Sequence, residues 1–182
     1  MLQRIRVLLK FRGGLLARRA GRLPEARRDF GVAAELARRC GSKRLLVPCL
    51  KGLAQIERDA GNTAAAVPLY REAVADCRSI GDKVLLAHTL RHLGDVHQDL
   101  DQWAEADACY REALASYRET GSARSLDLAN AIRAYALLKE RVGDPAEARE
   151  LWTEAHRLYA SSNAPAGVAE SATHLAKLEG ER

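Results

Sequence analysis

The sequence repeats one pattern at intervals of 40, 40 and 42 residues. A turn-like segment recurs four times along the chain, as Gly21-Arg-Leu-Pro-Glu-Ala26, Gly61-Asn-Thr-Ala-Ala-Ala66, Asp101-Gln-Trp-Ala-Glu-Ala106 and Gly143-Asp-Pro-Ala-Glu-Ala148. A fixed period of this length is typical of a stacked array of structural repeats rather than of one closed core. The sequence therefore predicts a solenoid.

Further residues keep the same register, and we call each set of equivalent positions a column. An aromatic column and an alanine column three residues later contain Phe30, Tyr70, Tyr110 and Trp152, and Ala33, Ala73, Ala113 and Ala155. A small-residue column contains Gly14, Ala54, Gly94, Ala136 and Ala176, and a turn column contains Gly41, Gly81, Gly121 and Asn163. We expect the small residues to let paired helices approach closely, for example Gly14 on Ala26 and Gly94 on Ala106. The aromatic rings should fill the space between neighbouring repeats.

Each repeat is predicted to contain two helices. Apolar residues before each inner turn follow i, i+3, i+4 spacing, as in Val84, Ala87 and Leu90, and a second apolar stretch follows the turn. Asp144 precedes Pro145 as an N-cap before a first helical residue. The fold class is therefore an all-α solenoid of stacked antiparallel helix pairs, with about nine helices in one array over residues 1–182. The repeats span about 7–41, 44–81, 84–121 and 126–163, with a partial repeat or capping helix at 166–179.

Basic residues gather at the N-terminal end. Residues 1–44 hold 13 Lys or Arg and 3 acids, whereas the rest of the chain holds 16 and 21. A basic end on an acidic body suits nucleic acid, anionic lipid or an acidic protein as a partner, and equally suits a solvated surface. Residues 1–24 contain seven Lys or Arg, no acid and several apolar residues. They read either as an ordinary first repeat helix, which we favour, or as a membrane-surface helix or transit sequence.

Composition narrows the remaining classes. No apolar run approaches the roughly 18 residues that a membrane span needs, and cations between residues 4 and 12 interrupt any secretory signal. The four cysteines show no Cys-x-x-Cys spacing, which favours free buried thiols in a reducing cytoplasm. The excess of Arg over Lys, together with the Ala content, is typical of a GC-rich bacterial genome. We expect a bacterial, cytoplasmic protein.

The columns resemble the tetratricopeptide repeat family over about residues 7–162. In that pattern a small residue stands in the first helix, Gly precedes the second helix, and Ala, an aromatic and Ala follow within it. The chain departs from the family in its period of about 40 residues, which is similar to the variant in kinesin light chains and large bacterial regulators, and in Leu50, Leu90 and Ile132 at the usual Trp position. The resemblance implies a right-handed superhelix whose first helices line a concave groove.

Cations recur on the first helices. Lys51, Arg91 and Arg133 share one column, and Arg12 and His174 fall one residue along. The family's geometry implies that this column faces the groove, where the cations would form a ladder that captures an acidic segment. The alternative is a set of unrelated surface cations. The expected peptide-binding residues are Arg12, Lys51, Gln55, His88, Arg91, His92, Asp95, Asn130, Arg133 and His174.

One face of the helix that precedes Asp101 carries two imidazoles and two carboxylates. His88, His92, Asp95 and Asp99 follow i, i+4, i+7, i+11 spacing and project from the same side. Histidines four residues apart can share a zinc or nickel ion, with Asp95 as a third ligand. The sequence His-Thr-Leu-Arg-His lacks the metalloprotease glutamate, so we interpret the stripe as a polar groove lining and expect no tight metal site.

No catalytic signature is found. The sequence contains no G-x-S-x-G, Walker A or G-x-G-x-x-G motif, and no nucleophile, base and orienting group can be assembled. We therefore expect no enzyme activity and no cofactor. The sequence predicts an interaction scaffold that binds an extended acidic or mixed-charge peptide segment. The alternative is part of a nucleic-acid-linked regulator, in transcription control or RNA processing, that uses the basic first 44 residues.

Overall fold

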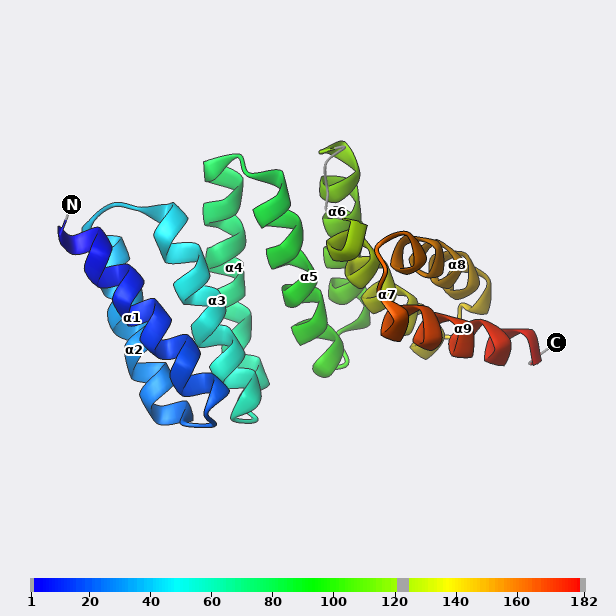
Figure 1. Ribbon diagram of the computed structural model, residues 1–182, viewed down its shortest axis with the longest axis horizontal. Coiled ribbons are helices and arrows are strands. Elements are labelled where there is room, and N and C mark those ends of the chain that lie inside the picture. The colour runs from blue at the N-terminus through cyan, green and yellow to red at the C-terminus, as the bar shows by residue number, and fades with distance from the viewer. Residues whose placement is uncertain (1, 121–124, 181–182) are drawn as a thin grey trace. The chain divides into compact units, whose positions relative to one another are not determined.

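The computed structural model describes residues 2–120 and 125–180, without the side chain of Ser125. Within those ranges the chain forms nine α-helices and no strand (Figure 1). Their bounds are α1 (Leu2–Arg19), α2 (Leu23–Arg39), α3 (Lys43–Asp59), α4 (Thr63–Ile80), α5 (Lys83–Asp99), α6 (Trp103–Glu119), α7 (Ser125–Arg141), α8 (Pro145–Ser161) and α9 (Pro165–Gly180). The predicted all-α fold and the number of helices are confirmed.

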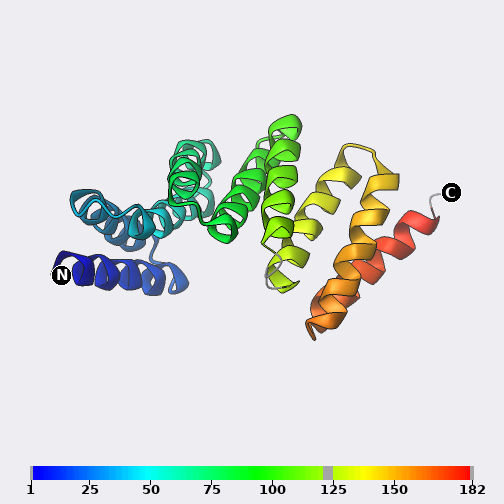
Figure 2. The ribbon, with the colours of Figure 1, turned by 90° about the horizontal axis from the view of Figure 1, so that it is seen from above.

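The helices form two compact units, Met1–Thr89 and Leu90–Arg182, which we describe separately. In the first unit α1 packs on α2, α2 on α3, and α3 on α4. In the second unit α6 packs on α7, α7 on α8, and α8 on α9. Figure 2 shows these neighbouring helices side by side. Within each unit these helices thus pack on the helix next to them in sequence, as in a solenoid of stacked helix pairs.

The turns between helices need residues that accept a positive φ. The inner turns place Gly21, Gly61, Asp101 and Gly143 at φ between 57° and 81°, and the outer turns place Gly41, Gly81 and Asn163 at 52° to 75°. Glycine reaches this region without a steric cost, and Asn and Asp are the non-glycine residues most often found there. The predicted turn columns are confirmed at these seven positions, while Gly121 lies outside the described residues. Asp144 also caps α8 as predicted, accepting a hydrogen bond from the Glu147 amide.

The aromatic and alanine columns form the core. Phe30, Tyr70, Tyr110 and Trp152 are at most 1% exposed, and the four alanines of the following column are fully buried. The ring of Phe30 lies against Gly14 of its own repeat and Gly52 of the next, so it fills the space between repeats as predicted. The ring of Tyr110 lies against Gly94 in the same way. The small residues Gly14 and Gly94 therefore make room for the rings.

Two of the four cysteines are buried free thiols, as predicted. They are Cys49 and Cys77, whereas Cys40 and Cys109 are only half-buried. Burial raises the pKa of the Cys49 thiol to about 12, which keeps it protonated and unreactive at neutral pH. Among the described helices, none is both long and apolar enough to cross a lipid bilayer.

Candidate functional site

The predicted groove residues fall into both units. Arg12, Lys51, Gln55 and His88 belong to the first unit. Lys51 Nζ lies 2.7 Å from His88 Nδ1, so the structure brings these two side chains together across α3 and α5. Arg12 is exposed and Gln55 is half-buried. In the first unit, therefore, two of the four predicted residues are in direct contact.

In the second unit, Arg91 of α5 is held by its neighbours on the same helix. Its Nη1 lies 3.2 Å from Asp95 Oδ2, and its Nη2 lies 2.7 Å from His92 Nε2. The Tyr110 hydroxyl of α6 donates a 2.9 Å hydrogen bond to the other oxygen of Asp95. Three of the predicted groove residues thus form one cluster around the Asp95 carboxylate.

The charge state of this cluster follows from its contacts. Burial alone would raise the pKa of Asp95, but the hydrogen bond with His92 and the charge of Arg91 hold it below its ordinary value. Burial and the neighbouring Asp95 charge raise the pKa of Tyr110, so the phenol remains a hydrogen-bond donor. The cluster therefore presents a fixed carboxylate whose charge is matched by Arg91.

Arg133 of α7 forms the strongest ion pair of the predicted set. Its Nε and Nη2 donate 2.6 Å hydrogen bonds to the two carboxylate oxygens of Glu170 on α9. The hydrogen bonds from Arg133 hold the pKa of Glu170 below its ordinary value, and Glu170 in turn raises the pKa of Arg133. This two-bond geometry is the arrangement that an arginine fork favours with a carboxylate. Sequence reasoning missed Glu170, which is 37 residues away from Arg133.

His174 of α9 is part of a second contact between first helices. Its ring stacks on Trp152, with centroids 4.2 Å apart, and its Nδ1 lies 2.7 Å from Glu140 Oε1 on α7. The Trp152 indole N–H donates to the same Glu140 oxygen. His174 therefore packs on Trp152, one member of the buried aromatic column. Sequence reasoning also missed Glu140, because nothing in the repeat pattern links it to His174.

Asn130 completes the predicted set on α7. Its side-chain oxygen accepts a 2.9 Å hydrogen bond from the Tyr159 hydroxyl of α8. Burial raises the pKa of Tyr159, with a further increase from the charge of Glu170 and an opposing effect from Arg133 and Arg91. The first helices of the second unit thus carry both cationic and anionic groups, in the order Arg91, Asp95, Arg133 and Glu170.

The histidine stripe does not converge on a metal site in the described residues. Of its members, His92 and Asp95 are in contact, with Nδ1 and Oδ2 3.4 Å apart. Within residues 2–120 and 125–180, no group of three or more His, Cys, Asp or Glu side chains is placed to hold a metal ion. The Asp95 oxygens are occupied by Arg91 and Tyr110 instead.

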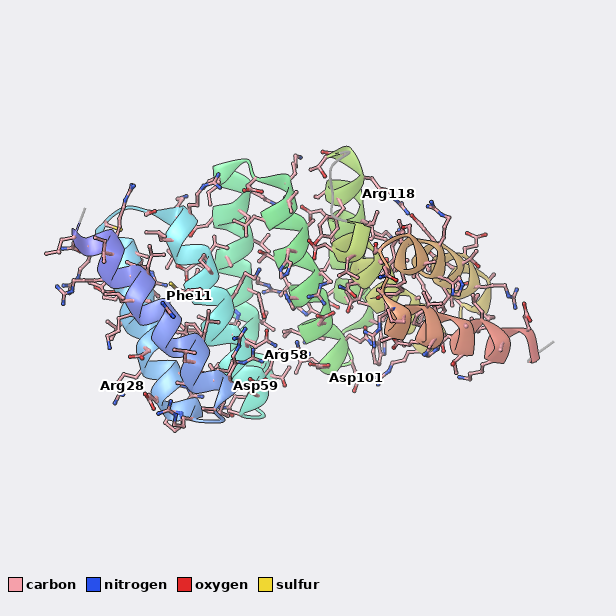
Figure 3. The ribbon with its side chains drawn as sticks, in the orientation of Figure 1. Phe11, Arg28, Arg58, Asp59, Asp101 and Arg118 are labelled. Atoms are coloured by element: carbon pink, nitrogen blue, oxygen red, sulfur yellow. The ribbon has the colours of Figure 1, made fainter. Side chains whose placement is uncertain are left out.

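The second helices of this unit border a hollow of about 550 Å³. Arg111 and Arg118 of α6 line one side, Glu150 and Glu154 of α8 line the other, and Tyr135 of α7 also contributes. Arg118, labelled in Figure 3, pairs with Glu154 at 2.9 Å. The cations that line the hollow are therefore engaged by carboxylates of the same unit.

These features define a class of protein: an α-solenoid of stacked helix pairs, in whose described residues no group of three or more His, Cys, Asp or Glu is placed to hold a metal ion. The chain belongs to the tetratricopeptide repeat family, whose model matches residues 5–79 and 85–161. Proteins of this family generally act as scaffolds for protein–protein interaction. No curated protein sequence matches the chain.

Solved structures share the fold. A signal transduction ATPase with numerous domains that carries a tetratricopeptide repeat sensor, from Pyrococcus horikoshii, matches 95% of the chain with a TM-score of 0.84 and 14% identity. The apo form of RapI matches 91% of the chain with a TM-score of 0.84 and 11% identity. The chain spans only 27% and 60% of these two proteins.

A protein of Podosopora anserina described as a kinesin light chain, with nearly identical TPR-like repeats, matches the whole chain and 90% of its own length. The TM-score is 0.81 and the identity is 20%. At such identities these similarities concern the fold alone. They confirm the predicted solenoid of tetratricopeptide type.

Proposed function

We propose that this chain is an interaction scaffold whose first helices bind an extended, mixed-charge segment of a partner protein. The observation that carries the proposal is the alternation of charge along these helices. Arg91 and Asp95 on α5 are followed by Arg133 on α7 and Glu170 on α9, and all four side chains are partly exposed. A segment that carries both signs of charge would find a partner group for each.

The existing ion pairs favour mixed charge over acidic charge alone. A purely acidic segment that approaches Arg133 meets a cation whose charge Glu170 already balances through two 2.6 Å hydrogen bonds, and Glu170 repels it. A segment with a Lys or Arg beside its carboxylate can instead pair with Glu170 while its own carboxylate approaches Arg133. This exchange leaves no charge without a partner, which is the condition for a favourable interface.

The test uses three fluorescent peptides of about 15 residues, one rich in Glu, one rich in Lys and one in which Glu and Lys alternate. We expect the alternating peptide to bind most tightly, and the triple variant Arg91→Gln, Arg133→Gln, Glu170→Gln, all in the second unit, to weaken it about tenfold or more. Single exposed ion pairs contribute about 0.2–1 kcal/mol each, and three of them together reach the roughly 1.4 kcal/mol of a tenfold change.

The matched control neutralises three exposed arginines of second helices, Arg28, Arg71 and Arg157. Figure 3 shows Arg28 at the outer side of α2. Arg111 and Arg149 are unsuitable, because Arg111 pairs with Asp107 and Arg149 donates to the Leu178 carbonyl. If the control triple weakens the alternating peptide as much as the first-helix triple, binding is diffuse surface attraction and the proposal fails.

The alternative of a nucleic-acid-linked regulator remains a prediction that we do not favour. At least eight of the 13 cations in residues 1–44 are in ion pairs with carboxylates of this chain. To bind a phosphate backbone, those cations would have to exchange their present carboxylate partners. Affinity for duplex DNA that falls steeply with salt would favour the alternative over our proposal.

A further inference from the structure

Helix α1 presents a leucine stripe to solvent. Leu2, Leu9 and Leu16 recur every seven residues, and Ile5, Arg12 and Arg19 recur at the same interval three residues further on. This is the a and d spacing of a helix that packs along another helix. The exposed fractions of the four apolar side chains are 73% for Leu2, 48% for Ile5, 63% for Leu9 and 53% for Leu16. We call these six residues the α1 face.

Exposure of large apolar side chains is concentrated on this helix. Of the ten exposed large apolar residues among those described, six belong to α1. Single exposed apolar residues are normal, but a contiguous row of them marks an interaction surface. The α1 face therefore differs from the rest of the described surface.

In later repeats, the residues equivalent to Leu9 and Leu16 are buried. The column of Leu16 contains Ile56, Leu138 and Leu178, and the column of Leu9 contains Cys49, Ala131 and Ser171, all of which are buried. Ile56 packs on Ala17, Ala26 and Phe30, which belong to the repeat before its own. The α1 face thus occupies the position that receives helices of a neighbouring repeat elsewhere in the chain.

One charge on the α1 face is the reverse of its equivalent in the next repeat, although the fourth repeat again has an arginine, Arg141, at this position. Asp59, at the C-terminal end of α3 (Figure 3), accepts a 2.6 Å hydrogen bond from Arg18 of the preceding repeat. Its equivalent in the first repeat, 40 residues earlier, is Arg19. An arginine therefore stands where the following repeat offers a carboxylate.

The second helix shows a similar change. Glu72 of the second repeat accepts from Arg38, and Glu154 of the fourth repeat accepts from Arg118, at equivalent positions. The residue of the first repeat in the glutamate column is Val32, which is exposed. Consider a helix pair packed on the first repeat with arginines equivalent to Arg18 and Arg38. These arginines would meet Arg19 and Val32, where the second repeat has Asp59 and Glu72. A partner that binds the α1 face should therefore carry negative charge opposite Arg12 and Arg19.

We propose that the α1 face binds an amphipathic helix of a partner protein, with an apolar seam opposite Leu2, Leu9 and Leu16 and carboxylates opposite Arg12 and Arg19. A second copy of this chain is a poorer match, because its own α1 face offers no carboxylate to pair with Arg12 and Arg19. A membrane surface is also a poorer match, because Arg12 and Arg19 interrupt the apolar stripe itself instead of flanking it.

The probe is a helical peptide of about three heptads with leucine along its seam and glutamate beside it. We expect it to bind the wild-type chain, and Leu9→Gln with Leu16→Gln to weaken binding at least about tenfold. These side chains are exposed, so their replacement should leave the melting temperature unchanged. Val142→Gln is the matched control, because it removes an exposed apolar side chain from another repeat.

A charge exchange sharpens the test. Arg12→Glu with Arg19→Glu should lose the glutamate peptide and gain a peptide in which lysine replaces glutamate. Arg71→Glu with Arg157→Glu, on second helices, should change neither affinity. Equal loss in this control pair would overturn the proposal.

Two other occupants give distinct results. A dimer in sedimentation velocity that Leu9→Gln with Leu16→Gln dissociates would show that a second copy occupies the face. Binding to phosphatidylglycerol vesicles that competes with the glutamate peptide would show that the face is a membrane anchor. Either result overturns the proposal.

Discussion

Gly52 lies directly against the ring of Phe30. A Cβ built on Gly52 would stand 2.7 Å from two ring carbons, closer than real Cβ contacts allow. Gly14 approaches the same ring, where an added Cβ would stand 2.8 Å away. Since Phe30 is fully buried, the ring has glycine on both sides and little space to move. This contact joins the first and second repeats.

Gly52→Ala should therefore lower the free energy of unfolding by about 1–3 kcal/mol, because the added methyl overpacks the core. The intrinsic helix preference for alanine, about 1 kcal/mol, acts in the opposite direction. Gly31→Ala is the matched control, since a Cβ there meets nothing within 4 Å, and it should stabilise the chain by about 0.5–1 kcal/mol. Urea melts measure both. Equal stabilisation by both substitutions would contradict the close approach to Phe30.

Trp152→Ala should cost about 3–5 kcal/mol, because the indole is fully buried and its removal leaves a cavity. Ala113→Leu should cost about 1–3 kcal/mol by overpacking the fully buried alanine column. Trp152→Phe should cost less than Trp152→Ala, because it keeps an aromatic ring in the core. It still has a cost, because it loses the N–H that donates to Glu140. Denaturant melts check the order. Changes within about 0.5 kcal/mol of wild type would contradict the burial of these columns.

The ion pair of Arg133 and Glu170 should make stability depend on pH. The folded pKa of Glu170 lies below its ordinary value of 4.5, so its carboxylate stabilises the fold at pH above that value. This contribution is lost as pH falls through the folded pKa. Glu170→Gln should cost about 0.2–1 kcal/mol at neutral pH and flatten the fall in stability between about pH 5 and 3. Arg133→Gln should flatten it in the same way. Slopes equal to wild type would show that the pair does not couple to folding.

Zinc or nickel should bind no better than it does to an exposed histidine pair. A metal ion can bind Asp95 only after it displaces Arg91 from that carboxylate. This limits the stripe of His88, His92, Asp95 and Asp99 as a metal site. His92→Ala should therefore change metal affinity little in calorimetric titrations. A stoichiometric, submicromolar isotherm that His92→Ala abolishes would show that the stripe is a metal site.

The helix pairs, the turns and the buried columns follow from the sequence alone. A residue such as Phe30 recurs as Tyr70 and Tyr110 because each repeat buries the same position against similar neighbours. Gly21 and Gly41 recur with their equivalents because each turn needs the same positive φ. Periodicity reports local geometry directly, so these predictions needed no tertiary structure.

The contacts between repeats were decided only by the tertiary structure. Gly52 lies outside the small-residue column, yet it packs on Phe30 as closely as Gly14 does. The pairing of Arg133 with Glu170 was not predicted from the sequence. Both contacts join residues of different repeats, and their existence depends on how one helix stacks on the next. Periodicity specifies which face of a helix is buried, but the partner of a side chain depends on distances that only the packed helices define.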